Sequence, residues 1–227
     1  MKIALCFYGL CDNVNYENNY IEFKKSFESI KENIIQNNKC DIFIDTITQI
    51  DTTENDLLQF FNPKAYTIDK KIRYFDNNKN FLNINKKINI AAGRWYSQKN
   101  VIKLKSDYEI KNNFKYDVTF LTRFDCTYFT KFNFNELNLN KLYFGGWEIY
   151  EDPNLDYLKT GIDDLWFFGN SEIMYKFSLL FDDFTQLVKK INHTSNHLLA
   201  INYIKQYNIP YQSIKNHKKD YNITRRL

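Results

Sequence analysis

The sequence of 227 residues lacks an apolar run of the length that a membrane-spanning helix needs, which is about 20 residues. Its first apolar run, residues 3–10, is too short, and no small-residue cleavage pattern of a signal peptide follows before Asp12. We therefore interpret this run as a first strand and expect no transmembrane segment in the chain.

The four cysteines lack the paired spacing that is typical of a zinc site. Cys6 and Cys40 lie inside apolar, strand-like segments, where a thiol packs as a small core side chain. Unpaired cysteines of this kind indicate a reducing compartment, so we expect a cytoplasmic location.

Two classes of protein are disfavoured by other missing features. The formal net charge is only +4, and the basic residues cluster only within residues 217–226, which we interpret as a solvated segment. Nucleic acid needs a basic groove, so we expect no nucleic-acid partner. No G-x-G-x-x-G loop follows the first strand, since only Gly9 is present, which disfavours dehydrogenases and methyltransferases.

The sequence does contain the pattern of an α/β domain. Hydrophobic residues make up 44% of the chain, which favours a globular protein with a sizeable core. Strands are predicted at residues 3–8, 41–47 and 65–68, with helices at residues 23–34 and 57–61 between them. This order predicts a mostly parallel, twisted sheet with helices on both faces.

The rest of the chain continues in the same way after an excursion at residues 70–89, which are rich in lysine and asparagine. Asn170 or Ser171 is expected to cap a helix whose buried stripe runs as far as Phe184. The other predicted elements are helices at 91–110 and 195–208 and strands at 118–121, 141–144, 165–168 and 210–214. No repeat or linker interrupts the pattern, so we predict one domain over residues 1–227.

The most informative segment is residues 116–125, which read YDVTFLTRFD. Its apolar residues predict a buried central strand, because parallel strands that are covered on both faces carry near-continuous apolar runs. Arg123 and Asp125 follow at its carboxyl end, where ligand sites of open α/β sheets form. Asp125 could hold a divalent cation, which in turn binds a diphosphate. Alternatively, the two residues form a solvated pair that caps the strand.

Two other segments carry candidate binding residues. Arg94 and Ser97 share one face of the helix at residues 91–110, near its predicted N-terminus, where a phosphate can bind; Arg94 could equally form a surface salt bridge. Trp147 follows Gly145 and Gly146 and could stack on a sugar ring or lie in the core.

Asp163 and Asp164 are adjacent carboxylates directly before an apolar strand. Neighbouring carboxylates can separate in pKa, so that one remains ionised and accepts a proton near neutral pH. In an extended segment they point in opposite directions, so one is expected to be the base and the other to cap the turn or bond a backbone N–H. We assign the base to Asp164, which is nearer the strand; a purely structural turn is the alternative.

Taken together and in this order, these segments resemble glycosyltransferases of the GT-A type, most closely the small enzymes of bacteria and large viruses. Residues 116–125 resemble their strand-plus-acid motif, and residues 2–9 resemble their first strand and nucleotide loop. Residues 94–109 resemble the helix before that motif, and residues 163–172 resemble the segment that closes the acceptor side.

The resemblance implies a nucleotide-binding part, about residues 1–126, and an acceptor part, about residues 127–227. It implies transfer of a sugar from a nucleotide-diphosphate sugar, such as a UDP-sugar, to a hydroxyl group of a glycan or glycoconjugate, in the host cytoplasm if the protein is viral. The implied donor-binding residues are Phe7, Tyr8, Gly9, Arg94, Ser97, Arg123, Phe124 and Trp147.

The resemblance also implies a Mn²⁺ or Mg²⁺ ion at Asp125, but the sequence departs from the family here. The usual metal motif is Asp-x-Asp, and Arg123 occupies its first position. Arg123 could instead supply positive charge to the diphosphate or pair with a structural acid. The alternative function is a non-catalytic module of the same fold that binds a nucleotide sugar or a carbohydrate.

Overall fold

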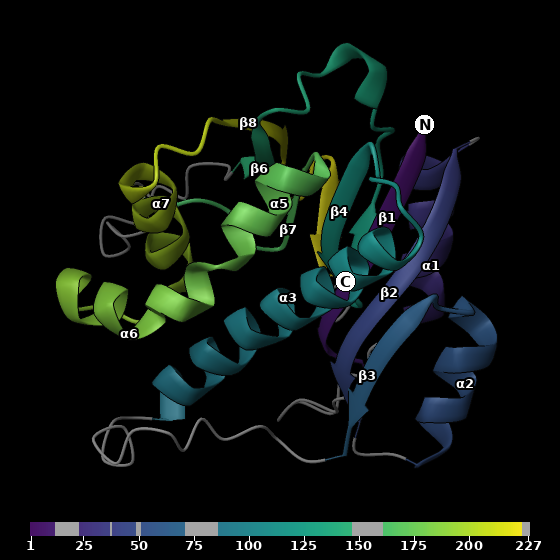
Figure 1. Ribbon diagram of the computed structural model, residues 1–227, viewed down its shortest axis with the longest axis horizontal. Helices are drawn as coiled ribbons and strands as arrows, with labels where there is room; N and C mark the ends of the chain where they lie inside the picture. Colours follow the sequence, from purple (N-terminus) through teal and green to yellow (C-terminus); the bar gives the residue numbers. More distant parts are fainter. Residues whose placement is uncertain (12–22, 37, 49–50, 71–85, 147–160, 224–227) are drawn as a thin grey trace.

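The computed structural model describes residues 1–11, 23–36, 38–48, 51–70, 86–146 and 161–223. Among these residues, a seven-stranded sheet has the order β3-β2-β1-β4-β7-β6-β8, and β5 and β9 form a separate pair (Figure 1). The strands are β1 (Lys2–Leu10), β2 (Lys39–Ile47), β3 (Ala65–Asp69), β4 (Val118–Arg123), β5 (Cys126–Tyr128), β6 (Leu142–Gly146), β7 (Trp166–Gly169), β8 (Tyr211–Asn216) and β9 (Tyr221–Ile223).

The helices fill the connections between these strands. They are α1 (Phe23–Ile30), which continues into a π-helical turn (Lys31–Ile35), α2 (Asp51–Phe61), α3 (Lys86–Lys111), a 3₁₀ turn (Phe134–Glu136), α5 (Ser171–Ser178), α6 (Leu180–Ile191) and α7 (Asn196–Gln206). No helix within the described ranges has both the length and the apolar character needed to cross a membrane.

The large sheet is mostly parallel, as the sequence pattern predicted. The pairs β1–β2, β1–β4, β2–β3 and β6–β8 are parallel, and only β7 runs against its neighbours β4 and β6. Strand β4 is the fourth of the seven strands, so the segment that carries Arg123 and Asp125 does leave the centre of the sheet. Because β7 runs antiparallel to β4, the first residues of β7 lie beside the last residues of β4.

The side chains of β1 divide between the two faces of the sheet. Ala4, Cys6 and Tyr8 belong to the core beneath α3, α5, α6 and α7, which we call the α3 face. Ile3, Leu5 and Phe7 belong to the core beneath α1 and α2, which we call the α1 face. Figure 1 shows α3 crossing in front of the sheet while α1 lies behind it. Both faces are therefore covered, which explains the continuous apolar character of β1.

Several element boundaries differ from those predicted. Helix α3 begins at Lys86, inside the expected excursion, whose residues 71–85 lie outside the described residues. The single helix expected after Asn170 is two helices, α5 and α6, with Leu179 between them. The expected cap is confirmed, since the Asn170 side chain accepts a hydrogen bond from the backbone N–H of Ile173 at 2.8 Å. Strands β5 and β9 were not predicted, because three residues are too few to show an alternating pattern.

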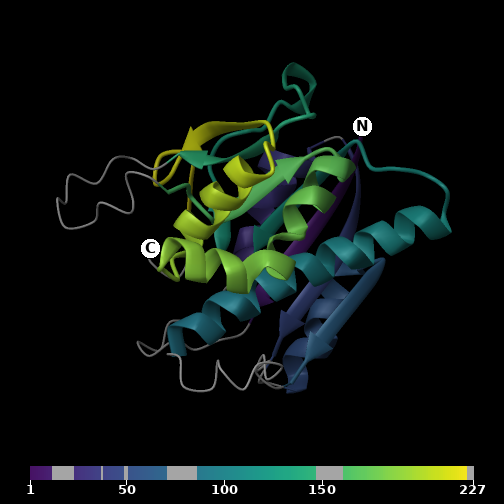
Figure 2. The same ribbon diagram turned by 60° about the vertical axis from the view of Figure 1, so that its left-hand side comes forward.

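Helix α3 joins the first strands of the sheet to the helices α5 and α6. It packs on β1, β2 and β3 and also against α5 and α6, as Figure 2 shows from the side. A fully buried ion pair holds its second half in place: Lys105 Nζ lies 3.0 Å from Glu109 Oε2 and 2.6 Å from Ser171 Oγ of α5. The other oxygen of Glu109 accepts the backbone N–H of Tyr116 at 2.8 Å. This network ties α3 to α5 and to the segment before β4.

We expect Lys105→Met to lower the free energy of unfolding by about 3 kcal/mol, because the buried Glu109 carboxylate keeps only the exposed Lys115, at 3.6 Å, as a counter-charge. The double variant Lys105→Met/Glu109→Gln should recover part of this loss, since it removes both charges and keeps an acceptor for Tyr116. Equilibrium unfolding in urea measures both values. The matched control is Lys103→Met, which removes an exposed partner of Asp107 on the same helix and should cost less than about 0.5 kcal/mol. Equal effects of the two single variants would contradict this account.

Candidate functional site

Polar and charged side chains gather at the carboxyl ends of β1, β2 and β4. Tyr8 and Gly9 lie near the end of β1, and Arg123 is the last residue of β4. Strand β7 pairs antiparallel with β4, with Trp166 opposite Thr122, so the residues just before β7 arrive at this same edge. Asp164 is among them. The reversed strand thus adds an acid from late in the sequence to a site built from the early strands.

Arg123 and Asp125 form a two-pronged ion pair. Arg123 Nε lies 2.8 Å from one oxygen of Asp125, and a terminal nitrogen lies 2.6 Å from the other. The side chains are 18% and 2% exposed, so the pair is largely buried rather than solvated. Burial alone would lower the pKa of Arg123, but the Asp125 carboxylate outweighs it and raises that pKa above its ordinary value.

This arrangement does not fit a divalent cation at Asp125. Both carboxylate oxygens accept hydrogen bonds from the guanidinium of Arg123, which leaves the strongest acceptor directions engaged. Within the described ranges, no group of three or more His, Cys, Asp and Glu side chains is arranged to hold a metal ion. The residues that are present fit an arginine-based anion site better than a metal site.

A second arginine, Arg94, also contacts Tyr8. Arg94 of α3 forms an ion pair with Asp164 at 2.7 Å, and its other terminal nitrogen donates to Tyr8 Oη at 3.0 Å and to the backbone carbonyl of Asp164. Tyr8 Oη in turn donates to that carbonyl at 3.1 Å. Burial raises the pKa of Tyr8 to about 12, against the opposing effect of Arg94, so its hydroxyl remains a donor at neutral pH. Arg94 Nε is buried and has no hydrogen-bond partner within the described ranges.

The expectation that Arg94 and Ser97 lie at a helix N-terminus is wrong, because α3 begins at Lys86. Ser97 is buried and bonds to protein groups on both sides. Its Oγ accepts the backbone N–H of Gly9 at 3.2 Å and donates to Asp45 of β2, 2.5 Å from the carboxylate. Ser97 therefore joins β1, β2 and α3. Gly9 has a φ of 91°, which favours glycine, and an added Cβ would meet no atom within 4 Å.

Two other expected donor-binding residues, Phe7 and Phe124, are not brought to this cluster. Phe7 and Phe124 are buried on the α1 face, and their rings stack with centroids 5.0 Å apart. Both side chains serve the core in this structure, and the expectation that these two residues contact a donor stays a prediction. Trp147 lies outside the described residues.

Asp163 and Asp164 have different partners, as expected of neighbouring residues in an extended segment. Asp163 accepts the backbone N–H of Leu165 at 3.1 Å and the hydroxyl of Tyr221, so it caps the turn. Burial, and then the charge of Asp164, raise the pKa of Asp163. Burial would also raise the pKa of Asp164, but the charges of Arg94, His197 and Arg123 together hold it below its ordinary value. The two carboxylates thus separate in pKa, with Asp164 as the ionised member.

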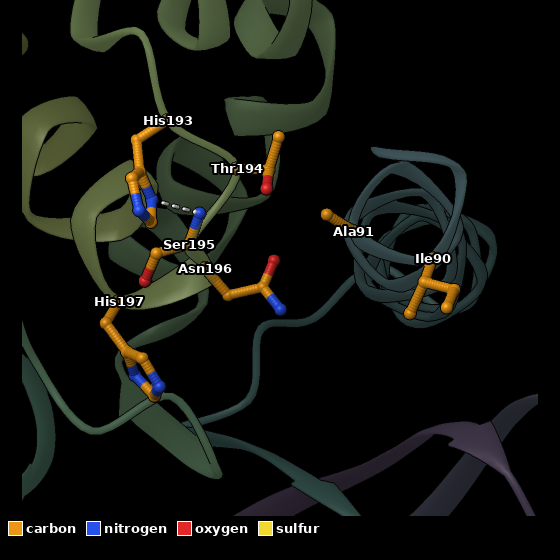
Figure 3. Close-up of a pocket in the computed structure, with 7 residues that line it drawn as sticks. All are labelled: Ile90, Ala91, His193, Thr194, Ser195, Asn196 and His197. Carbon is orange, nitrogen blue, oxygen red and sulfur yellow. Dashed lines mark hydrogen bonds between the residues drawn. The ribbon is translucent and has the colours of Figure 1, made fainter. Parts of the chain in front are cut away.

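His197 belongs to this site although the sequence did not single it out. Its Nδ1 lies 2.8 Å from the carbonyl oxygen of Ile162 and 3.5 Å from Asp164 Oδ1. His197 also lines a pocket with residues 193–196 and with Ile90 and Ala91 of α3 (Figure 3). In the sequence, His193 and His197 stand four residues apart near a predicted helix start. This spacing does not indicate that His197 lies near Asp164, because the two residues are far apart in the sequence.

No protein-family model matches this chain, and a search of curated proteins finds no significant relative.

We expect Asp164→Asn to lower the free energy of unfolding at pH 7 by about 3 kcal/mol, because Arg94 loses its counter-charge in a mostly buried site. The folded-state pKa of Asp164 is depressed, so its contribution is present above the unfolded pKa of about 3.9 and is lost as pH falls through the folded value. Below about pH 4 the variant should therefore lose stability less steeply than the wild type. Urea unfolding between pH 3 and pH 7 measures this, with Asp163→Asn as the control that should cost less at pH 7. Parallel pH curves for wild type and Asp164→Asn would contradict the assignment.

Proposed function

We propose that this chain transfers a sugar from a nucleotide-diphosphate sugar to a hydroxyl group of a glycan or glycoconjugate. In this proposal residues 1–227 form a single GT-A-like domain whose donor binds at the carboxyl edge of the sheet. The observation that carries the proposal is the convergence of Arg94, Arg123 and Tyr8 at that edge, beside Asp164 and a polar pocket.

Arg94 and Arg123 suit the diphosphate of such a donor. Each is held in place by one carboxylate, and each retains N–H groups that the ion pair does not need, because a guanidinium has five donors. Arg94 Nε is buried without a partner among the described residues, and a buried donor of this kind is costly unless a ligand or water accepts from it. Phosphate oxygens accept such donors in the planar geometry that arginine provides.

The reaction requires negative charge to be stabilised on the leaving group. The bond between the anomeric carbon and the diphosphate oxygen breaks, its electron pair remains on the diphosphate, and the acceptor oxygen forms the new bond. Fixed donors that point at the developing charge lower the barrier most, because they need not reorganise during the reaction. The ion pairs with Asp125 and Asp164 hold the two guanidinium groups in fixed positions.

Asp164 suits the role of proton acceptor less well than the sequence predicted. Its carboxylate faces Arg94 and its pKa is lowered, so it holds a proton only weakly at neutral pH. In the proposed function Asp164 instead supplies a constant negative charge that positions Arg94 and His197.

A non-catalytic module that binds a nucleotide sugar is the second candidate. The observation that favours it is the Arg123–Asp125 pair, which occupies the place of the family's metal motif. Turnover separates the two functions, since both predict donor binding and only the enzyme predicts transfer or hydrolysis.

We expect nucleoside diphosphates and nucleotide-diphosphate sugars to stabilise the protein in a thermal-shift panel, by about 2.7 kcal/mol for the matching ligand at a hundredfold its Kd. The double variant Arg123→Gln/Asp125→Asn removes both charges of one pair and should weaken that binding at least tenfold. The matched control is Lys31→Gln/Glu28→Gln, which removes an exposed pair and should leave binding unchanged. If no nucleoside diphosphate or nucleotide-diphosphate sugar in the panel stabilises the protein, the proposal is overturned. If a ligand binds but is not turned over, the non-catalytic binding module is the remaining function.

Transfer and donor binding should survive an excess of chelator, because in this structure arginine side chains provide the positive charge. Assays with EDTA and with added Mn²⁺ or Mg²⁺ measure this, using the nucleotide sugar identified by the panel. Loss of activity in EDTA with recovery on Mn²⁺, together with an inactive Asp125→Asn variant, would show instead that Asp125 is a metal ligand.

A further inference from the structure

The pocket beside the arginine site has a volume of about 480 Å³ and lies between the beginning of α3 and the segment that leads into α7. Figure 3 shows Asn196 extending toward Ala91 of α3, with His197 on the same wall as Asn196. The lining residues are Ile90, Ala91, His193, Thr194, Ser195, Asn196 and His197. One wall thus carries hydroxyl, amide and imidazole groups, and the facing wall is apolar.

The polar wall suits the hydroxyl groups of a sugar. The side chains of Thr194, Asn196 and His197 line the pocket and together offer a hydroxyl, an amide and an imidazole. A sugar hydroxyl both donates and accepts a hydrogen bond, so it can pair with any of these groups. The apolar wall of Ile90 and Ala91 suits the C–H face of a sugar ring.

His197 is held in one tautomer. Its Nδ1 lies 2.8 Å from the carbonyl oxygen of Ile162, and a carbonyl can only accept, so Nδ1 carries the hydrogen. In the neutral imidazole Nε2 is then the basic nitrogen. The backbone N–H of Ile162 also donates to the carbonyl of His197 at 3.4 Å, which fixes this residue against the strand-leading segment.

Asp164 joins His197 to the arginine site. One carboxylate oxygen lies 3.5 Å from His197 Nδ1, and the other lies 2.7 Å from Arg94. A carboxylate beside Nδ1 stabilises the imidazolium that forms when Nε2 accepts a proton. Among the described residues, the charged or titratable groups near the ring are Asp164 before β7, Arg94 on α3 and His193 in the same segment. Arg123, the last residue of β4, acts at longer range through Asp164.

We propose that this pocket binds the acceptor sugar and that His197 Nε2 removes the proton of its attacking hydroxyl, with Asp164 as the positioning residue. The inference rests on the proposed glycosyl transfer and names its acceptor site and base. The acceptor O–H bond breaks, its proton moves to Nε2, and the oxygen forms the bond to the anomeric carbon. The bond to the diphosphate breaks and its electrons leave with the diphosphate. The imidazolium then releases its proton to water.

The test compares transfer with donor binding in His197→Gln and His197→Ala, using the UDP- or GDP-sugar that the thermal-shift panel identifies and methyl glycosides of common hexoses as acceptors. We expect kcat for transfer to fall about 10²–10⁴-fold, as is typical for loss of a general base. The Kd for the nucleoside diphosphate should change less than about twofold, because His197 is placed on the acceptor side. Added imidazole should restore part of the activity of His197→Ala.

The pH profile gives a readout that a structural role would not change. In the wild type kcat/KM should fall at acid pH as the catalytic base becomes protonated, and this acid limb should be absent in His197→Gln. Asp164→Asn should shift the acid limb to lower pH, because the imidazolium loses its neighbouring negative charge. His217→Gln is the control: this histidine is stacked on Tyr221 away from the pocket, and its variant should keep the acid limb.

The outcomes separate the two proposals. If the wild type transfers sugar and His197→Gln transfers it at the same rate with the same acid limb, the assignment of the base is overturned and the proposed function stands. If the wild type neither binds nor turns over a nucleotide-diphosphate sugar, the proposed function fails, and the role of His197 fails with it. A product that retains the anomeric configuration, made equally well by the His197 variants, would also overturn the assignment.

Discussion

The ion pair between Arg94 and Asp164 is the interaction on which the candidate site depends. It joins the first half of α3 to the segment before β7, with side chains only 16% and 4% exposed. A pair of this kind adds little net stability, because removing both charges from water costs about as much as their attraction returns. Loss of either partner is costly, however, since the other charge remains buried. The pair therefore acts mainly as a constraint on position, and it fixes where Tyr8 and His197 lie.

The same pair explains why two neighbouring carboxylates have different properties. Asp164 faces Arg94, with His197 and Arg123 nearby, and its pKa is lowered despite burial. Asp163 points to Tyr221 and to the backbone of Leu165, and its pKa is raised by burial and by the charge of Asp164. The sequence shows only two adjacent acids. Their roles follow from the side of the extended segment on which the cationic groups lie, which is a property of the tertiary structure.

Local patterns were sufficient to predict a mostly parallel sheet and its central strand, and partly sufficient for the site. The apolar runs of β1 and β4 and the Asn170 cap are read from neighbouring residues. The start of α3 could not be predicted in this way, because the lysine- and asparagine-rich residues before Ala91 show no apolar stripe. Arg94 was therefore expected at the N-terminus of the helix, whereas it lies inside it. The burial of Phe7 follows from strand alternation, since it shares a face with Ile3 and Leu5. The approach of His197 to Asp164 depends on the reversed strand β7, for which the sequence has no local signal.

The charges of the site bear on how a diphosphate would be accommodated. Arg94 and Arg123 are balanced by Asp164 and Asp125, so these four side chains carry no net charge before a donor binds. Under the proposed mechanism His197 becomes cationic when it takes the proton of the attacking hydroxyl group. At that step the leaving diphosphate becomes more negative. Proton transfer would thus add positive charge to the cluster when the transition state needs it, whereas a permanently bound metal ion would add it earlier, in the donor complex. A site that gains its charge during the reaction favours the transition state over the bound donor, which is the physical requirement for catalysis.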